Sequence, residues 1–508
     1  MKKSALLFAV LLFELFAFAV KDNSQQPEKD FAAAYDAYIR KTMERIPAIP
    51  GLAVVVIKDD RPIFLRAYGM ADREAGKKAD TDTLFYTASS TKSFTAVAAA
   101  LLDREGKIKL DDSVTKYTTG ISFKNPLPEK IKVRDLLTHT SGLRNSPLVF
   151  RMAFSGQSEP ADMIKIFADA TTYSDANYGK YAYDNLGYNI YGLLVQNHLK
   201  KKWQDVLQEK IFNPLRMKHT TAYISRAGAK KWTVAAPYTF NAEHETTIRS
   251  PLAKTDSNLQ SAGGIFTSIS DMGTWLTVHM NDGRIKGKQV IPVDIIRAAH
   301  TGYTQTTRDA PPFSGNGEYG LGWQIGKYGS EKVHYHHGGF SGYRSHMSFM
   351  PERRIGIAVL VNEDFAGSLI ADVLATYGYD RLAGKENVDE LYVKRLEDFL
   401  QDYTKGKQRM QVSAAERGKR VLQLTLPLAD YAGRYTNEIF GTIDVTPSGK
   451  GLAVAMGNIK IVSTPFTEKD TIRVEMIPPQ GETIKFQKSA EGRIESLTYR
   501  NVKFSRVN

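Results

Sequence analysis

Two side chains capable of nucleophilic chemistry stand three positions apart in the segment Ser89-Ser90-Thr91-Lys92. Positions i and i+3 lie one above the other on a helix, so Lys92 can bring its amine to the Ser89 hydroxyl. A serine hydroxyl becomes nucleophilic when a neighbouring base removes its proton. The alternative is that Ser89 only caps a helix. An Ala-rich amphipathic helix is expected after this motif, whereas the same spacing at residues 113–116 has none, which favours Ser89 as a nucleophile.

Tyr183 and Asn185 supply a phenol and an amide two positions apart, in the pattern Tyr-x-Asn. The same pattern recurs at positions 435–437 and 499–501, in a strand-rich region where a surface tyrosine explains it. Tyr183 instead stands where a helix is expected to begin, in the same part of the chain as Ser89. The sequence leaves open whether Tyr183 is catalytic or a half-buried packing residue.

A glycine pair follows two histidines in the segment His336-His337-Gly338-Gly339. Glycines let a strand edge approach a ligand closely and leave backbone N–H groups free for it. Further histidines at positions 334 and 346 raise the question of a metal. No carboxylate or cysteine stands at ligand spacing, and adjacent histidines on a strand face opposite ways. We therefore expect no metal site here.

Two β-hairpins are expected to hold these motifs in place, one near each end of the first 385 residues. Apolar runs separated by turn residues predict one β-hairpin over residues 52–68 and another over residues 345–362. A mainly helical region with Gly- and Pro-rich loops lies between them. Early and late strands around a helical middle are typical of an α+β domain whose sheet is built from both ends of the segment.

The order of the three motifs resembles that of the serine β-lactamase and penicillin-binding-protein superfamily. In its class C-like branch, which holds many esterases and D-amino-acid peptidases, S-x-x-K is followed by Y-x-N and then by K-T-G or H-x-G. The resemblance covers roughly residues 31–385 and implies an antiparallel sheet flanked by helices plus an all-helical lobe. Further similar stretches are residues 135–143, 262–264 with Ser268 and Asp271, and 319–323.

The resemblance also implies a mechanism of acyl transfer without a cofactor. Ser89 would attack a carbonyl while Lys92 and Tyr183 share the task of taking its proton. Free amines and phenols both have pKa values near about 10, and the sequence does not decide which of the two is the base. Asn185 would orient Lys92 or the substrate amide. The backbone N–H groups of Ser89 and Gly339 would form the oxyanion hole.

One departure from many members of the superfamily concerns the substrate. Where β-lactamases and transpeptidases carry K-T-G, this chain has His336-His337-Gly338. The resemblance therefore implies His336 as a catalytic residue beside Ser89, Lys92 and Tyr183, and Gly338 and Gly339 as substrate-binding residues with Asn185. A lysine there is a fixed positive charge for a substrate carboxylate, whereas histidine is mostly neutral near pH 7. A small ester or a D-amino-acid peptide is therefore favoured over a β-lactam, with cell-wall fragments as possible partners. The alternatives are a true class C-like β-lactamase and a catalytically weak penicillin-recognition protein.

The first residues have the features of an export signal. A short positive start, an apolar run over residues 5–20 and the small-x-small sequence Ala17-Phe18-Ala19 predict a signal peptide at residues 1–19. Its removal would leave a periplasmic or secreted protein with no stable membrane span. Glu14 is unusual inside such a run, so whether the signal is cleaved or kept as an anchor stays open.

Composition predicts three more segments outside the region of resemblance. Residues 20–30 form a polar tether, and residues 386–427 form a charged helical connector. From residue 428 to residue 508, short strands alternate with turns, which predicts a small antiparallel β-barrel. The stretch 431–435 within it resembles the lipocalin-like domain that is often appended to such hydrolases.

Composition also excludes several kinds of chemistry. The 508 residues contain no cysteine, which rules out disulfides, thiolate catalysis, cysteine zinc sites and iron–sulfur clusters. The net charge is +13, yet the Lys and Arg residues are spread along the chain without a long basic block. Binding to nucleic acid requires a localised basic face, so no nucleic-acid partner is expected.

Overall fold

The computed structural model of the chain describes residues 26–306 and 311–507. The expected signal peptide at residues 1–19 lies outside the described residues. Helix α1 (Gln26–Arg45) begins inside the stretch expected as a tether, so the end of that stretch is helical rather than extended. Within the described ranges, every helix is too short or too polar to cross a bilayer.

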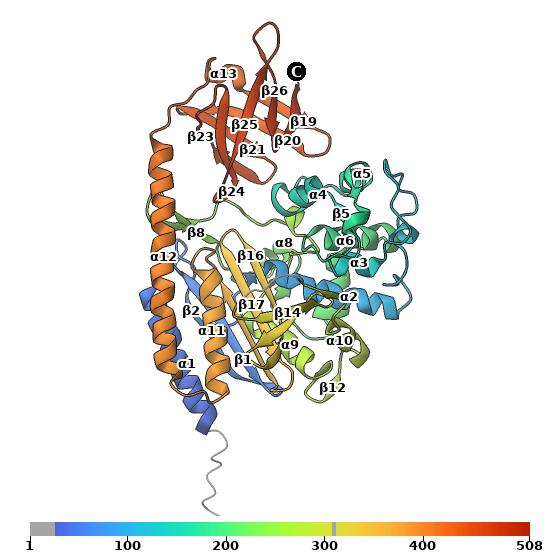
Figure 1. Cartoon of the computed structure of the whole chain (residues 1–508), viewed down its shortest axis with the longest axis vertical. Coiled ribbons are helices and arrows are strands. Elements are labelled where there is room, and N and C mark those ends of the chain that lie inside the picture. The colour runs from blue at the N-terminus through green and yellow to red at the C-terminus, as the bar shows by residue number, and fades with distance from the viewer. Residues whose placement is uncertain (1–25, 307–310, 508) are drawn as a thin grey trace, which may run out of the picture.

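A nine-stranded antiparallel sheet forms the centre of the larger domain (Figure 1). Its order is β13-β14-β15-β16-β17-β18-β1-β2-β3, so the first strand of the chain pairs with the last one of this domain. This arrangement confirms the α+β class with a sheet built from both ends. The strands are β1 (Gly51–Lys58), β2 (Arg61–Asp72), β3 (Lys77–Lys78), β13 (Thr304–Gln305), β14 (Ser314–Tyr319), β15 (Gln324–Tyr328), β16 (Glu331–Phe340), β17 (Tyr343–Met350) and β18 (Ile355–Val361).

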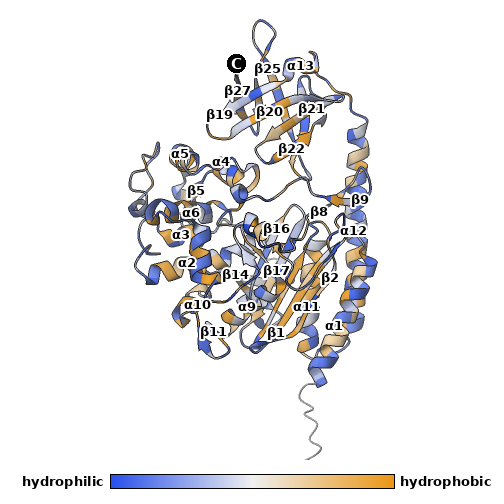
Figure 2. Ribbon diagram, turned by 180° about the vertical axis from the view of Figure 1, so that it is seen from behind, coloured by the Kyte–Doolittle hydropathy of each residue, from blue (hydrophilic) through white to orange (hydrophobic). Residues whose placement is uncertain are grey.

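Strand β1 is buried on both faces, and its alternating side chains separate two cores. Val55 and its alternating neighbours pack with α2 (Thr91–Arg104) and α9 (Ile269–Met280), whereas Val54 and its neighbours pack with α1 and α11 (Gly367–Leu382). Figure 2 shows the hydrophobic colouring of β1 against the largely hydrophilic α12 (Val388–Gly418).

In the helical lobe beside the sheet, helix α6 (Leu186–Leu199) directly follows the second sequence motif, Tyr183-x-Asn185. Leu186, Ile190 and Leu194 on α6 are buried in the same core as α2. The remaining helices of this domain are α3 (Val133–Leu137), α4 (Ser146–Phe150), α5 (Pro160–Ala170), α6 (Leu186–Leu199), α7 (Trp203–Leu207), α8 (Ile224–Ala229) and α10 (Val293–Ala299). The short strands are β4 (Phe85–Tyr86), β5 (Leu143–Arg144), β6 (Thr172–Tyr173), β7 (Thr220–Thr221), β8 (Tyr238–Asn241), β9 (Thr246–Arg249), β10 (Phe266–Thr267), β11 (Arg284–Ile285) and β12 (Lys288–Gln289).

Helix α12 runs along α1 and α11 and leads to a nearly closed antiparallel barrel (Figure 1). The barrel follows the short α13 (Leu428–Tyr431) and has a core of alternating apolar side chains. Its strands are β19 (Gly433–Asn437), β20 (Gly441–Ser448), β21 (Gly451–Met456), β22 (Ile459–Val462), β23 (Thr464–Pro465), β24 (Thr471–Ile477), β25 (Gln480–Lys488), β26 (Ile494–Tyr499) and β27 (Val502–Val507).

The barrel is docked onto the larger domain by specific polar contacts. The Gln157 side chain donates to the Thr442 carbonyl at 2.9 Å and accepts from the Thr442 N–H at 2.9 Å. The Asn458 N–H donates to the Ser155 carbonyl at 2.7 Å. Phe150 of α4 is buried within the core of the barrel. These contacts place the barrel against residues 150–157 of the larger domain.

Candidate active site

Ser89 lies at a sharp turn between strand β4 and helix α2. Strand β4 pairs with β10, which fixes the chain up to Tyr86. A short 3₁₀ turn, η2 (Ala88–Ser90), then leads into α2, and Ala88 has a φ of 45°. A positive φ is uncommon for a residue other than glycine and occurs where the surrounding structure enforces it. The turn leaves Ser89 half-buried at the entrance to α2, whereas Lys92 is completely buried.

The amine of Lys92 is held by three oxygen atoms. Its Nζ lies 3.2 Å from Ser89 Oγ, 2.7 Å from Asn185 Oδ1 and 3.0 Å from the carbonyl oxygen of Ala262. An ammonium group has three N–H donors, so these acceptors account for all of them. The structure therefore brings Ser89, Lys92 and Asn185 together, as the sequence predicted for a catalytic group.

Tyr183 lies against the same amine. Lys92 Nζ is 4.9 Å from the centre of the Tyr183 ring and 5.5 Å from that of Tyr188. The Tyr183 side chain is 37% exposed, and its hydroxyl makes no hydrogen bond to any described residue. Helix α6 begins at Leu186, so Tyr183 precedes it rather than opening it. Asn185 is the residue at the helix entrance, and it links this segment to Lys92.

His336 is buried on the face of β16 that points toward these groups. Its ring lies 6.2 Å from the Tyr183 ring, centre to centre. Its Nδ1 is 2.8 Å from the carbonyl oxygen of His337, and because a carbonyl can only accept, Nδ1 carries a proton. Its Nε2 lies 3.3 Å from the hydroxyl of Tyr319. His336 is thus fixed by hydrogen bonds, and it is 1% exposed.

Gly338 and Gly339 bring strand β16 against the turn that carries the serine. A Cβ atom at Gly338 would lie 2.0 Å from the Thr87 carbonyl oxygen and 2.3 Å from Ser345 Oγ. Only glycine fits such an approach. Ser345 Oγ donates to the Thr87 carbonyl at 2.8 Å and lies 2.9 Å from Ser90 Oγ, which ties the strand to this turn.

Three further aromatic residues lie beside Lys92 or Tyr183 and are not part of the three motifs: Tyr188, Tyr319 and His139. The His139 ring lies 4.5 Å from that of Tyr183 and 4.8 Å from that of Tyr319, centre to centre. His139 has a φ of 62°. It belongs to the stretch 135–143, which matched the family pattern and was the available signal for a residue at the site.

Burial and charge keep the His139 imidazole neutral. Burial, followed by the charges of Lys92 and His336, holds the pKa of His139 well below its usual range. Its Nδ1 accepts a 3.4 Å hydrogen bond from the Asp184 N–H, so the proton of the neutral ring is on Nε2. That Nε2 has no hydrogen-bond partner among the described residues. Burial and the neighbouring tyrosines likewise raise the pKa of Tyr319 well above its usual range.

A cavity of about 400 Å³ opens beside Tyr183 and Asn185. The barrel contributes Arg500, which follows β26, to its wall. The guanidinium of Arg500 lies 4.4 Å from the centre of the Phe150 ring, and its Nε lies 2.6 Å from Glu482 Oε1. The other lining residues are Arg144, Asn145, Ser146, Val149, Phe154, Ala182, Asp184 and Leu186.

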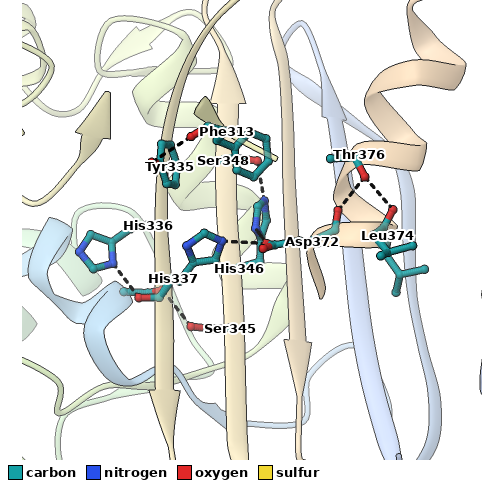
Figure 3. Close-up of polar contacts among 12 residues, drawn as sticks. Phe313, Tyr335, His336, His337, Ser345, His346, Ser348, Asp372, Leu374 and Thr376 are labelled. Carbon is teal, nitrogen blue, oxygen red and sulfur yellow. Dashed lines mark hydrogen bonds and ion pairs between the residues drawn. The ribbon is translucent and has the colours of Figure 1, made fainter. Parts of the chain in front are cut away.

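The structure brings a carboxylate to two of the histidines, which spacing along the sequence did not reveal. His337 faces away from His336, and it lies on the same face of the sheet as His346 of β17 (Figure 3). Asp372 of α11 reaches both rings with one carboxylate oxygen. Burial alone would raise the pKa of the Asp372 carboxyl, but the two histidines outweigh it and hold the pKa well below its usual range. The carboxylate comes from a helix that follows the hairpin, so sequence spacing within the strands did not reveal it.

Comparison with known families gives a match to the family model described as Beta-lactamase over residues 38–374. Protein flp of Staphylococcus aureus (strain MW2) is 24% identical over 324 residues, which are 62% of this chain and 60% of that protein. Unguisins hydrolase ungD of Aspergillus violaceofuscus is 24% identical over 452 residues, or 82% of this chain and 78% of that protein. The chain thus spans about three fifths of the length of the staphylococcal relative.

Two solved structures share the fold of both domains. An octameric penicillin-binding protein homologue from Pyrococcus abyssi superposes with a TM-score of 0.60 at 22% identity, covering 93% of this chain and 99% of that one. The crystal structure of SurE superposes with a TM-score of 0.55 at 20% identity, covering 95% of this chain and 100% of that one. At this level of identity, the likeness is one of fold.

Proposed function

Because this chain belongs to the β-lactamase family, we propose that it is a serine hydrolase that forms an acyl-enzyme on Ser89. The proposed substrates are small esters or amides, including D-amino-acid peptides. A hydrolase among its relatives and a penicillin-binding protein homologue among its structural neighbours support this class of reaction. The observation that carries the proposal is the contact of 3.2 Å between the buried Lys92 amine and Ser89 Oγ.

In the proposed acylation step, the Ser89 oxygen attacks the substrate carbonyl as its proton leaves. Lys92 and Tyr183 share this proton transfer, because the amine contacts Ser89 and also lies 4.9 Å from the centre of the Tyr183 ring. The pair accepts the Ser89 proton when one of the two groups starts without its own, as a neutral amine or as a phenolate, and a positive charge on Lys92 favours the phenolate. Asn185 and the Ala262 carbonyl hold the amine in position throughout.

The oxyanion that forms on the carbonyl is proposed to bind the backbone N–H groups of Ser89 and Gly339. Strand β16 can approach the serine turn this closely because position 338 has no Cβ atom. Each such donor contributes about 10²–10³ in rate. The proton then passes to the leaving group, and Tyr183 activates a water molecule that releases the acyl group from Ser89.

The charges at the site support substrates that lack a carboxylate next to the scissile bond. His336 occupies the position of the lysine in K-T-G. It is buried, and its ring nitrogens lie within hydrogen-bond distance of the Tyr319 hydroxyl and the His337 carbonyl. Lys254 lies nearby, with its Nζ 3.7 Å from the centre of the Phe340 ring, but burial holds the pKa of its amine well below the usual range. Neither residue supplies the fixed positive charge that K-T-G supplies.

The residues before α1 support a proposed export to the periplasm or the medium. Cell-wall fragments, which such a location would make accessible, are the proposed natural partners. N-terminal sequencing of the protein from each cell fraction tests the proposed export. A start at residue 20 in the exported fraction is expected, and a full-length chain in the cytoplasm contradicts it.

Hydrolysis assays with three substrates test the proposed function. Wild type and Ser89→Ala are compared on a short-chain nitrophenyl ester, a chromogenic cephalosporin and a D-alanyl peptide. We expect the wild type to cleave the ester fastest and the variant to lose activity on every substrate. A preference for the cephalosporin would identify a class C-like β-lactamase, and covalent penicillin binding without turnover would identify a recognition protein.

A further inference from the structure

On the face of the sheet opposite His336 and Ser89, we propose that His337, His346 and Asp372 bind a zinc ion. The three residues come from β16, β17 and α11, and their side chains converge at one point (Figure 3). The inference is independent of the proposed hydrolase function, because none of these side chains contacts Ser89 or Lys92.

Strand pairing and helix packing fix the position of all three ligands. His337 and His346 are directly opposite each other in the antiparallel pair β16–β17, so their rings lie on the same face. Asp372 Oδ1 lies 2.7 Å from His337 Nε2 and 2.7 Å from His346 Nδ1. The three candidate ligand atoms are all within 4.8 Å of one another.

The donor set is one that zinc prefers. Two imidazole nitrogens and one carboxylate oxygen are borderline and hard donors, and three protein ligands leave a fourth position for water. Zinc binds these atoms at about 2.0–2.2 Å, which places tetrahedral ligands about 3.3 Å apart. The two distances of 2.7 Å must therefore widen by about 0.6 Å. Rotation of the His337 ring can supply this movement, since its side chain is 35% exposed.

The surroundings provide both an entry path and support for the ligands. The side chains of His337 and Asp372 are partly exposed, whereas that of His346 is completely buried. When Nδ1 of His346 binds the metal, its Nε2–H can donate to Ser348 Oγ, which lies 2.7 Å away and also contacts the Tyr379 hydroxyl. A hydrogen-bonded second nitrogen fixes the ring orientation of metal-binding histidines.

A zinc ion at this position would join α11 to strand β16. His337 lies between His336 and Gly338, so the ion would hold the part of β16 whose opposite face approaches Ser89. The expected effect is a stabilised domain, because a metal that binds only the folded chain shifts the unfolding equilibrium.

Zinc titration of the full-length chain, purified without a polyhistidine tag and treated with chelator, tests the proposal. Isothermal calorimetry and elemental analysis after dialysis should give one zinc per chain for the wild type. Asp372→Asn and His337→Gln should weaken binding at least about 100-fold. The control His244→Gln, an exposed histidine in the β8–β9 turn, should bind as the wild type does. Zinc should raise the Tm of the wild type and the control alone.

Cobalt provides a second readout, because a tetrahedral site gives visible absorption that should be lost in both variants. His337 is partly exposed, so its replacement tests the site even if Asp372→Asn fails to fold. Zinc binding that is unchanged in His337→Gln, or absent in the wild type, overturns the proposal. So does loss of binding in His300→Gln, which would assign the ion to the buried cluster of His279, His300 and His334.

Discussion

Lys92 Nζ donates a 2.7 Å hydrogen bond to Asn185 Oδ1, which joins two segments 93 residues apart in the chain. Lys92 is on α2, and Asn185 stands at the entrance of α6. The bond directs the amine toward Ser89 and holds the segment that carries Tyr183 against it. This hydrogen bond between the two segments therefore fixes the geometry on which the proposed chemistry depends.

Replacing Lys92 by methionine should abolish acylation while preserving most of the side-chain volume. General acid–base groups contribute about 10²–10⁴ in rate, so kcat/KM on the ester should fall by at least that factor. Lys116→Met is the matched control, because Lys116 ends the second S-x-x-K match and its side chain is exposed. Steady-state kinetics and circular dichroism of both variants check the prediction. Equal losses in the two variants would contradict a role for Lys92.

Tyr183→Phe should lower kcat by about 10²–10⁴ and leave the packing against Lys92 intact, since only the hydroxyl is removed. Tyr183 is 37% exposed, so the variant should keep the Tm of the wild type. Tyr435→Phe is the control from another Tyr-x-Asn pattern, and it should lose stability but not activity, because its hydroxyl donates to the Tyr431 carbonyl at 2.8 Å. Single-turnover kinetics that remain unchanged in Tyr183→Phe would refute this assignment.

Gly338→Ala should damage both stability and activity. The added Cβ would meet the Thr87 carbonyl at 2.0 Å, so the strand or the serine turn must move. Overpacking of this kind costs about 1–3 kcal/mol, and a displaced catalytic group costs about 100-fold in rate. Gly228→Ala, where a Cβ meets nothing within 4 Å, should have neither effect. Denaturant unfolding and ester hydrolysis distinguish the two variants.

The free energy of unfolding should fall as the pH drops below about 6.5, and His334 should contribute to that fall. Burial lowers the pKa of His334 to about 3, so the unfolded chain takes up a proton between pH 6.5 and 5 that the folded chain does not. The loss amounts to about 2 kcal/mol by pH 5. Glu363 acts in the opposite direction, because burial raises its pKa to about 7. His334→Phe should therefore reduce the loss, whereas His244→Gln should not.

Tryptophan fluorescence can follow this transition in the larger domain alone, because all four tryptophans of the chain lie within it: Trp203, Trp232, Trp275 and Trp323. Urea titrations at pH 7.5 and pH 5 give the two free energies of unfolding for each variant. An identical pH dependence in the wild type and His334→Phe would show that folding does not shift the pKa of His334.

Arg500→Ala should change substrate selection rather than chemistry. Arg500 reaches from the barrel into the wall of the cavity that Tyr183 and Asn185 also line. We expect about a tenfold increase in KM for an ester with a bulky acyl group and little change in kcat for an acetyl ester. Arg493→Ala, an exposed arginine of the barrel, is the control. Equal KM values for both esters would exclude a role of the barrel in selection.

The sequence predicted those features that depend on local pattern. The S-x-x-K spacing predicted that the Lys92 amine lies next to the Ser89 hydroxyl, because helical geometry brings positions i and i+3 together. Both hairpins were evident because apolar runs flank turn residues such as Asp59. The ordered motifs indicated the family, which the match over residues 38–374 confirms.

Features that depend on tertiary contacts could not be predicted in this way. The Ala262 carbonyl that accepts from Lys92 lies 170 residues away, and the family resemblance of stretch 262–264 did not reveal that contact. His139 and Tyr319 lie beside Tyr183 because distant segments pack together, which the resemblance of their stretches did not show either. Asp372 escaped notice for the same reason, since it lies on a helix 35 residues after His337.

Acylation of Ser89 can be followed by intact-mass spectrometry after the protein is mixed with a fluorophosphonate or a slowly turned-over ester. We expect a mass increase of one acyl or phosphonyl group in the wild type, mapped to the peptide that contains Ser89 and absent from Ser89→Ala. In the wild type, the ester-derived adduct should disappear with time as water releases the acyl group. A wild-type chain that stays unmodified, or an adduct that persists in Ser89→Ala, would contradict the account.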